Sequence, residues 1–303
     1  MAALLALLSS VLWGTSDFLG GTMSRRRPPL AVVGFSQTAG LLVMVFVVLL
    51  TGAWGAPLDY LPWAVLAASS GLFGLWTFYS ALATGTMGIV SPIAATGIIV
   101  PLGAGLLVGD LPSLVQAAGV VVAIAGLGFV VAPESDPHVL ADSDRALFGD
   151  PETRGGATGE ADELRSARWR PIILAAVSAL MFGTSLAAIA QGSLTSPTMT
   201  MAAMRVWSVA IMVLVAVFAR SLGGMTSADL PAVFVIGAFD VGANMAYGLS
   251  AAGGELVVAA VLGSLYPVFT VMLAWRVHGE RLRVVQYAGV ALALVGVVLM
   301  SVG

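Results

Sequence analysis

Residues 30–51 read LAVVGFSQTAGLLVMVFVVLLT, with no charged side chain from one end to the other. An α-helix rises ~1.5 Å per residue, so a run of this length crosses the ~30 Å hydrocarbon core of a bilayer. Backbone polar groups in lipid must bond within their own segment, which favours a helix over any open alternative. Nine more such runs lie at 2–22, 62–84, 87–108, 113–132, 171–191, 199–220, 231–252, 255–276 and 284–302. The pattern predicts an all-α integral membrane protein of ten transmembrane helices.

The overall composition agrees with a chain that lies mostly in lipid. Hydrophobic residues make up 59% of the chain, charged residues only 10%, and the mean hydropathy is +1.00. Soluble domains carry roughly a quarter charged residues, so the soluble class is excluded. The chain has no cysteine, which excludes disulfides and thiolate chemistry, and we expect no cofactor and no metal. No basic patch points to nucleic acid.

The two halves of the chain repeat each other. At a shift of 169 residues, Gly14-Thr15-Ser16 aligns with Gly183-Thr184-Ser185. At a shift of 170 residues, Gly109-Asp110 aligns with Gly279-Glu280. A unit of five helices has an odd number of crossings, so its copy must enter the membrane inverted. We therefore expect two inverted five-helix repeats.

A polar break at 133–170 separates the repeats, which we place at 1–132 and 171–303. The break is rich in acidic residues, proline and glycine, and it has too few apolar residues to form a core of its own. We expect it to be a flexible acidic linker. A regulatory or partner-binding role is the alternative.

Twelve of the thirteen arginines fall in loops that this topology places on one side of the membrane. They are Arg25, Arg26, Arg27, Arg145, Arg154, Arg165, Arg168, Arg170, Arg220, Arg276, Arg281 and Arg283. Basic residues accumulate in cytoplasmic loops. The pattern predicts a multi-pass protein of the bacterial plasma (inner) membrane with the 133–170 loop in the cytoplasm and both termini outside. The initial apolar run lacks a basic leader and a cleavage site, which favours a retained first span over a signal peptide.

Several short motifs, taken in their order along the chain, resemble the drug/metabolite transporter superfamily and its ten-helix EamA type. They are Trp13-Gly14 with its repeat Phe182-Gly183, the fourth-span residues Pro92, Gly97 and Pro101, Pro267, and Gly279-Glu280 followed by Gln286 and Gly289. The resemblance covers nearly the whole chain except 133–170 and implies a transporter. The family usually has a basic residue in the second and seventh helices, whereas this chain has only Arg205, with Ser36 at the repeat position. The family often has cytoplasmic termini, whereas the arginines here favour the reverse.

Ionisable residues inside a span are costly and are candidates for function. Asp240 lies nine residues into the eighth span, roughly 13 Å from its end and near the midplane. Asn244 and Tyr247 follow on the same helix face, and Arg205 in the seventh span is long enough to reach toward Asp240. One interpretation is a solute- or proton-binding face, with Asp240 as proton carrier and Arg205 as counter-charge or anion anchor. The other is a structural ion pair.

Asp17 lies in a glycine-rich stretch eight residues before Arg25. As a gate residue it would pair with the arginine cluster when the cytoplasmic side closes, with Arg25 as its partner. The alternative is an interfacial aspartate in headgroup water.

Hydroxyl and aromatic side chains complete the candidate lining. Thr15, Ser16, Thr184 and Ser185 lie at corresponding depths in the two repeats; they line a cavity or, alternatively, bond to helix carbonyls and pack helices. The aromatic residues Trp76, Tyr79, Trp207 and Tyr266 lie too deep for the interfacial belt and are candidates to stack on a solute.

These residues favour a secondary active transporter of a small polar or amphipathic metabolite or drug, driven by proton-coupled export or exchange through alternating access. There is no nucleotide-binding motif in the sequence to supply ATP drive. An uncoupled facilitator or a flippase for lipid-linked precursors is the second hypothesis. An intramembrane enzyme is disfavoured, because Asp17, Asp110 and Asp240 are expected at different depths. The expected partners are the solute, membrane lipid and, as coupling ion, a proton, in a monomer or a homodimer that packs through Gly119-x-x-x-Ala123 and Gly289-x-x-x-Ala293.

Overall fold

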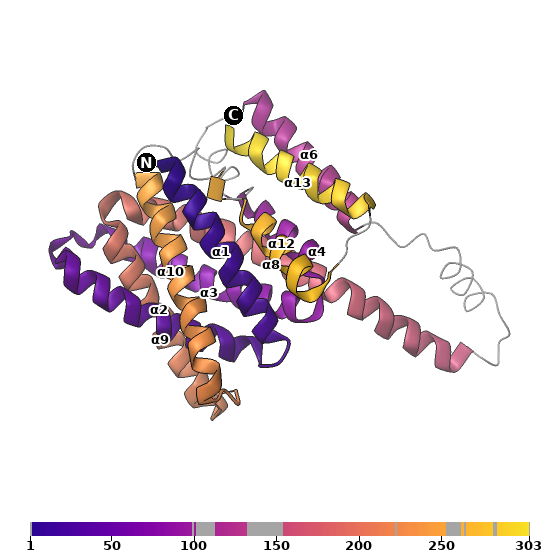
Figure 1. Ribbon diagram of the computed structural model, residues 1–303, viewed down its shortest axis with the longest axis horizontal. Coiled ribbons are helices and arrows are strands. Elements are labelled where there is room, and N and C mark those ends of the chain that lie inside the picture. The colour runs from indigo at the N-terminus through magenta and orange to yellow at the C-terminus, as the bar shows by residue number, and fades with distance from the viewer. Residues whose placement is uncertain are drawn as a thin grey trace.

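The computed structural model describes residues 2–98, 100, 113–131, 154–221, 223–252, 262–263, 265–280 and 284–302 (Figure 1). The described part is helical and contains no strand. Its α-helices are α1 (Ala2–Ser24), α2 (Pro29–Thr51), α3 (Leu61–Thr84), α4 (Met87–Ala95), α6 (Leu114–Val131), α8 (Arg154–Thr195), α9 (Pro197–Ala219), α10 (Leu230–Ala252), α12 (Tyr266–His278) and α13 (Val284–Val302). Among the single residues that carried sequence predictions, six lie outside the described ranges: Pro101, Gly109, Asp110, Arg145, Arg281 and Arg283.

Six of the described helices are long and apolar enough to cross a membrane. They cover Leu4–Ser24, Pro29–Thr51, Leu58–Thr84, Trp169–Thr195, Pro197–Ala219 and Ser227–Ser250. A shorter apolar helix covers Tyr287–Leu299. The chain is therefore a multi-pass, all-helical membrane protein, as its hydropathy predicted. The predicted spans 87–108 and 255–276 lie partly outside the described residues, and their described parts include α4 and α12.

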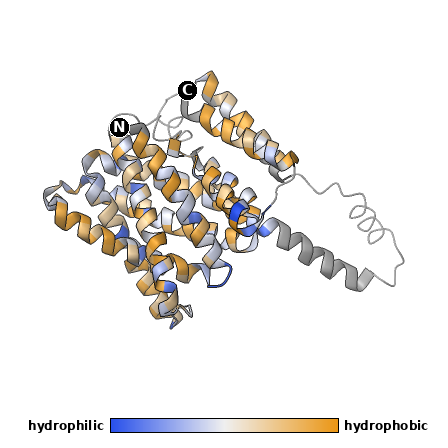
Figure 2. Ribbon diagram, viewed as in Figure 1, coloured by the Kyte–Doolittle hydropathy of each residue, from blue (hydrophilic) through white to orange (hydrophobic). Residues whose placement is uncertain are grey.

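Hydrophobic residues dominate the described helices, as Figure 2 shows, and many large ones are exposed. Large hydrophobic side chains such as Leu42, Leu49, Val217 and Phe218 are more than half exposed. A soluble protein rarely exposes so much contiguous apolar surface, so these side chains fit a surface that faces lipid.

The described helices begin and end at residues that commonly cap helices. Proline occupies the first turn of α2 and of α9, where no backbone N–H is needed. Gly52 and Gly279 follow α2 and α12 with φ angles of 63° and 66°, the left-handed conformation that glycine adopts without a Cβ penalty. Ser196 caps α9 by accepting a hydrogen bond from the backbone N–H of Met199 at 3.3 Å.

Helix α8 begins earlier than the sequence indicated. It starts at Arg154, inside the predicted flexible linker 133–170, rather than at residue 171. The last part of that predicted linker is therefore helical, and Pro171 lies within the helix. The earlier part of the linker, 133–153, lies outside the described residues.

The helices pack in pairs that match across the two halves. Helix α1 packs on α10 and α12, and its repeat counterpart α8 packs on α3 and α4. The hydroxyl of Ser16 on α1 donates to the carbonyl of Ile236 on α10 at 3.0 Å. The hydroxyl of Ser185 on α8 donates to the carbonyl of Ala67 on α3 at 2.9 Å. Both the donors and the acceptors are related by the repeat shift of 169 residues, so the two bonds are the same contact made twice.

Small residues hold α6 against α13, and Figure 1 shows these two helices side by side. A Cβ atom at Gly126 would lie 2.4 Å from the backbone nitrogen of Ala293, and one at Gly296 would lie 2.4 Å from that of Ala123. The small-residue motifs that the sequence offered as a dimer face thus lie in the contact between α6 and α13 of one chain.

Candidate functional site

A buried cluster of polar side chains lies where α2, α9 and α10 meet. Nη1 of Arg205 on α9 lies 2.9 Å from Oδ2 of Asp240 on α10. The same nitrogen donates a short hydrogen bond to Oε1 of Gln37 on α2. The amide of Asn244 donates to Oδ1 of Asp240 at 2.9 Å, across one turn of α10. The sequence prediction that Arg205 reaches Asp240 is thus met by this geometry.

Close helix approach puts the cluster out of contact with lipid. A Cβ at Gly237 on α10 would lie 2.2 Å from the carbonyl oxygen of Ser36 on α2, so these two backbones touch. Gly40 on α2 leaves room for Arg205, whose Cδ would lie 3.5 Å from a Cβ at that position. The side chain of Arg205 is only 5% exposed, against 15% for that of Asp240. One side of the ion pair therefore remains uncovered by protein, on the aspartate.

Three buried donors in this region have no hydrogen-bond partner in the part of the chain that the structure describes. They are Nε and Nη2 of Arg205 and the hydroxyl of Tyr266 on α12. Native proteins satisfy nearly all buried polar groups with protein or water. An unfilled set of donors in one region therefore marks a place where another molecule, water or solute, supplies the acceptors.

Asp17 on α1 lies in a central layer of the bundle with Asp240. Its side chain is buried, with 7% of the residue exposed, and its charge interacts with that of Asp240. No hydrogen bond or ion pair reaches its carboxylate from the described residues. Tyr79 interacts electrostatically with Asp17, Asp240 and Arg205, and its hydroxyl group packs against Gly20, one turn along α1. The two carboxylates are thus within electrostatic range of each other.

The aromatic candidates divide between the interior and the surface. The ring of Trp13 lies 5.7 Å from that of Tyr247 and 6.4 Å from that of Tyr266, which forms an aromatic wall beside Asp17. By contrast, Trp76 and Trp207 are 39% and 42% exposed on the outer face of the bundle. The structure does not bring these two tryptophans to the cluster.

The four predicted hydroxyl residues bond to backbone carbonyls. Thr15 and Thr184 donate to carbonyls four residues earlier in their own helices, at 2.7 and 2.9 Å. Ser16 and Ser185 make the paired bonds to α10 and α3 described above. Of the two interpretations of these residues, the contacts match helix packing.

Arg25 pairs with Glu280 and not with Asp17. Its Nη2 lies 2.6 Å from Oε1 of Glu280, and the other oxygen of Glu280 accepts the backbone N–H of Met87 at 2.9 Å. Arg27 lies 2.9 Å from Asp229. These contacts join the loops before α2, α4 and α10 to the end of α12, so the arginine-bearing loops meet at one end of the bundle.

Comparison with known proteins gives the family. A sequence model described as the EamA-like transporter family matches residues 1–132 and 169–302. The chain belongs to the EamA-like transporter family. It is therefore a membrane transporter of the drug/metabolite type, as the order of its motifs indicated, and the family points to transport rather than enzyme catalysis.

Solved structures agree with this transporter fold. Fourteen chains of solved structures match, and one of them, described as "Crystal structure of protein", is 18% identical with a TM-score of 0.64. The match covers 98% of the transporter and 95% of that chain. At this identity the likeness shows the fold alone. Among curated proteins, no match is found.

Three polar residues of the transporter make contacts that the sequence did not predict. Gln37 is an amide in the middle of an otherwise apolar span, and treating buried amides like charges would have found it. Glu280 was seen only as part of a repeat motif. His278, whose ring hydrogen-bonds with Thr22 at 2.8 Å, is the last residue of α12 and lies just beyond the predicted span 255–276.

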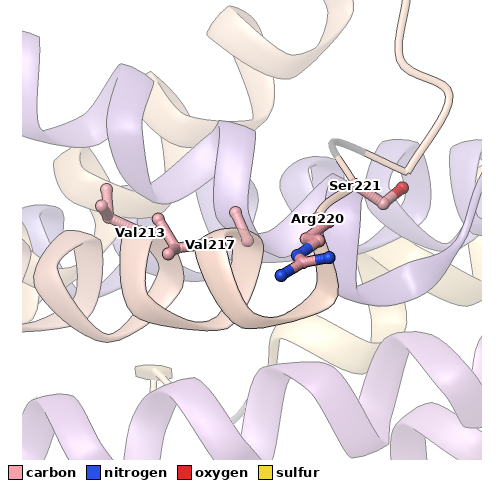
Figure 3. Close-up of a pocket in the computed structure, with 5 residues that line it drawn as sticks. Val213, Val217, Arg220 and Ser221 are labelled. Carbon is pink, nitrogen blue, oxygen red and sulfur yellow. The ribbon is translucent and has the colours of Figure 1, made fainter.

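Two surface grooves of the transporter lie away from this cluster. One is lined by Val213, Ala216, Val217, Arg220 and Ser221 at the end of α9, and Figure 3 shows four of these side chains labelled along that helix end. The other runs between α2 and α10 and includes Thr38 and Phe234. Both linings are mostly apolar and contain none of the cluster residues. The buried cluster is therefore the better candidate for chemistry.

Proposed function

We propose that this chain is a secondary active transporter of a small polar or amphipathic metabolite or drug. In this proposal it works by proton-coupled export or exchange across the bacterial inner membrane. Its ten helices form two inverted five-helix repeats, 1–132 and 171–303. The residues between the repeats link them on the cytoplasmic side, and both termini lie outside.

Paired contacts support the inverted arrangement. The bonds from Ser16 to α10 and from Ser185 to α3 are equivalent under the repeat shift. The packing of α1 on α12 has its counterpart in that of α8 on α4: Gly14 contacts the backbone of Tyr266, and Gly183 contacts that of Gly97. Two halves that exchange contacts in this way are related by a twofold operation, which is the arrangement that alternating access uses.

The observation that carries the proposal is the buried cluster between the halves. Gln37 and Asp17 come from the first half of the chain, and Arg205 and Asp240 from the second. Burying charged groups at this depth is costly, and transporters place such groups where the solute binds. Rocking one half against the other would open this cluster to each side in turn.

Proton coupling requires a carboxylate that changes its protonation state during the cycle. Asp240 already has Arg205 and Asn244 as partners. Asp17 has neither an ion pair nor a hydrogen bond within the described residues, and it faces the charge of Asp240. We therefore assign Asp17 as the first candidate for the proton carrier, with Asp240 as the alternative.

The contacts of Glu280 support a gate at the arginine-bearing end. Glu280 bridges Arg25 at the end of α1 and the first turn of α4. Such a contact across three helices must open before a solute can leave on that side. In this proposal Arg25 and Glu280 form the cytoplasmic gate.

The test uses purified protein in two steps. A thermal-shift screen against amino acids, nucleosides, sugars and cationic drugs identifies a ligand, and proteoliposomes containing a pH-sensitive dye then report proton movement with that ligand. We expect solute-dependent proton flux in the wild type and in Asp59→Asn, an exposed loop control. We expect Asp17→Asn to bind solute but to lose proton flux.

The results separate the alternatives. Loss of proton flux in Asp240→Asn but not in Asp17→Asn would move the carrier to Asp240. Solute flux that continues with no ion gradient and moves no protons would instead favour the uncoupled facilitator or flippase. Proton flux that survives both substitutions would refute the assignment of a carrier to this cluster.

A further inference from the structure

Only one nitrogen of the Arg205 guanidinium contacts a polar partner among the described residues. Its Nη1 serves both Asp240 and Gln37, while Nε and Nη2 are buried and have no partner among the described residues. Only 4% of the residue is exposed, so bulk solvent does not cover the free nitrogens. A buried donor without an acceptor is unfavourable, and the structure leaves two of them side by side.

The free side of the guanidinium has a defined shape. Nε and Nη2 form one edge of the planar group, and their N–H bonds point the same way. This edge matches the two oxygens of a carboxylate, which it binds through two parallel hydrogen bonds. A hydroxyl or an amide oxygen would satisfy only one of the two donors.

We propose that Arg205 binds a carboxylate of the transported solute through the free Nε–Nη2 edge. This inference rests on the proposed transport function and names its substrate class as solutes that carry one carboxylate. Tyr79 lies within electrostatic range of Arg205, and its buried hydroxyl is a further polar group in the same region.

The charges around Arg205 favour a solute with a single negative charge. Asp240 from α10 is paired with Arg205, and the charge of Asp17 from α1 acts on Asp240. Among the described residues, the other groups near them are neutral: Gln37 from α2, Tyr79 from α3 and Tyr266 from α12. A phosphate dianion would bring two negative charges into a region of low dielectric, which favours the single charge of a carboxylate.

The experiment measures binding alone, with protein in nanodiscs and no gradient. Isothermal titration calorimetry is used with benzoate, benzamide and benzylamine, which share one ring and differ in charge, and with acetate and acetamide as a smaller pair. We expect the carboxylates to bind and their amides to bind about tenfold more weakly or not at all.

Arg205→Lys tests the edge itself, because lysine keeps the charge beside Asp240 but has no planar fork. We expect carboxylate binding to weaken about tenfold in Arg205→Lys and to stay unchanged in Arg220→Lys, which alters an exposed arginine at the end of the same helix. If Arg205→Lys does not fold, the comparison of benzoate with benzamide on the wild type decides alone. The proposal is overturned if the amides bind as well as the acids, if benzylamine binds in place of benzoate, if no carboxylate binds, or if folded Arg205→Lys binds as the wild type does.

Binding and transport can fail separately. Carboxylate binding at Arg205 without any flux in proteoliposomes would leave this inference standing and remove the transport proposal. Proton-coupled flux of a solute that is unaffected by Arg205→Lys would do the opposite.

Discussion

Replacing the Arg205–Asp240 pair by two apolar residues should separate its structural role from its functional one. The variants are Arg205→Met, Asp240→Leu and the double substitution, which keep the approximate side-chain volumes. Breaking a buried ion pair by removing one partner costs about 3–5 kcal/mol, whereas replacing both partners by apolar residues is often neutral. We expect both single variants to be destabilised and the double variant to be close to the wild type.

The structure predicts which of the two single variants loses more stability. Asp240→Leu leaves Arg205 charged, 5% exposed in its side chain and bound only by the amide of Gln37, so its cost should lie at the upper end of that range. Arg205→Met leaves Asp240 with the amide of Asn244 and 15% exposure. The cost of Arg205→Met should therefore lie near or below about 3 kcal/mol.

The assay is reversible unfolding in mixed micelles, with flux of the identified solute measured on the same four proteins. A stable double variant that has lost transport would show that the pair serves function. The reasoning fails if each single variant loses less than about 1 kcal/mol, the value of an exposed ion pair. The functional role of the pair is refuted if the double variant is stable and still transports, because the pair would then be dispensable for both stability and transport.

Three further outcomes follow from contacts in the bundle. Ser16→Ala and Ser185→Ala should lower the free energy of unfolding by similar amounts, about 0.6 kcal/mol each, because they remove the same contact from the two halves. Unequal losses in the unfolding assay would argue against equivalence of the two contacts. Gly183→Ala places a Cβ 2.0 Å from the carbonyl oxygen of Gly97 and should cost about 1–3 kcal/mol, whereas Gly55→Ala, with no atom within 4 Å, should be nearly neutral in the same assay. Glu280→Gln removes the charge that holds Arg25 at 2.6 Å and should speed thiol labelling of a single cysteine placed at buried Ser24, measurable because the chain has no other cysteine; unchanged labelling would exclude Glu280 as a gate.

The helices could be predicted from the length of the apolar runs. That the two halves make equivalent contacts could be predicted from the repetition of the sequence. A run such as 30–51 has no stable alternative in lipid, and a repeated Gly-Thr-Ser segment must find equivalent surroundings in each copy. The start of α8 at Arg154 could not be predicted in the same way. The segment before residue 171 is polar, and hydropathy marks where a helix enters lipid rather than where it begins.

The rotation of each helix about its axis was harder to predict than its depth. Trp76 and Tyr79 are one turn apart on α3 and have similar depths, yet Trp76 is exposed and Tyr79 is fully buried. In a soluble helix an apolar stripe marks the inner face. In a membrane helix the lipid-facing and protein-facing sides are both apolar, so composition does not separate them. Trp76 and Trp207 were placed at the site for this reason.

The gate pairing of Asp17 with Arg25 failed on distance. Eight residues of helix separate them by ~12 Å along α1, more than the reach of their side chains toward each other. Arg25 therefore finds Glu280 at the arginine-bearing end, while Asp17 joins Asp240 and Arg205 in the central layer. Because α1 contributes one residue to each layer, it is placed to connect opening of the end contact with events at the cluster. Substitutions at Glu280 should then change access to the cluster without changing its affinity, and substitutions at Asp17 should change proton binding without opening the gate.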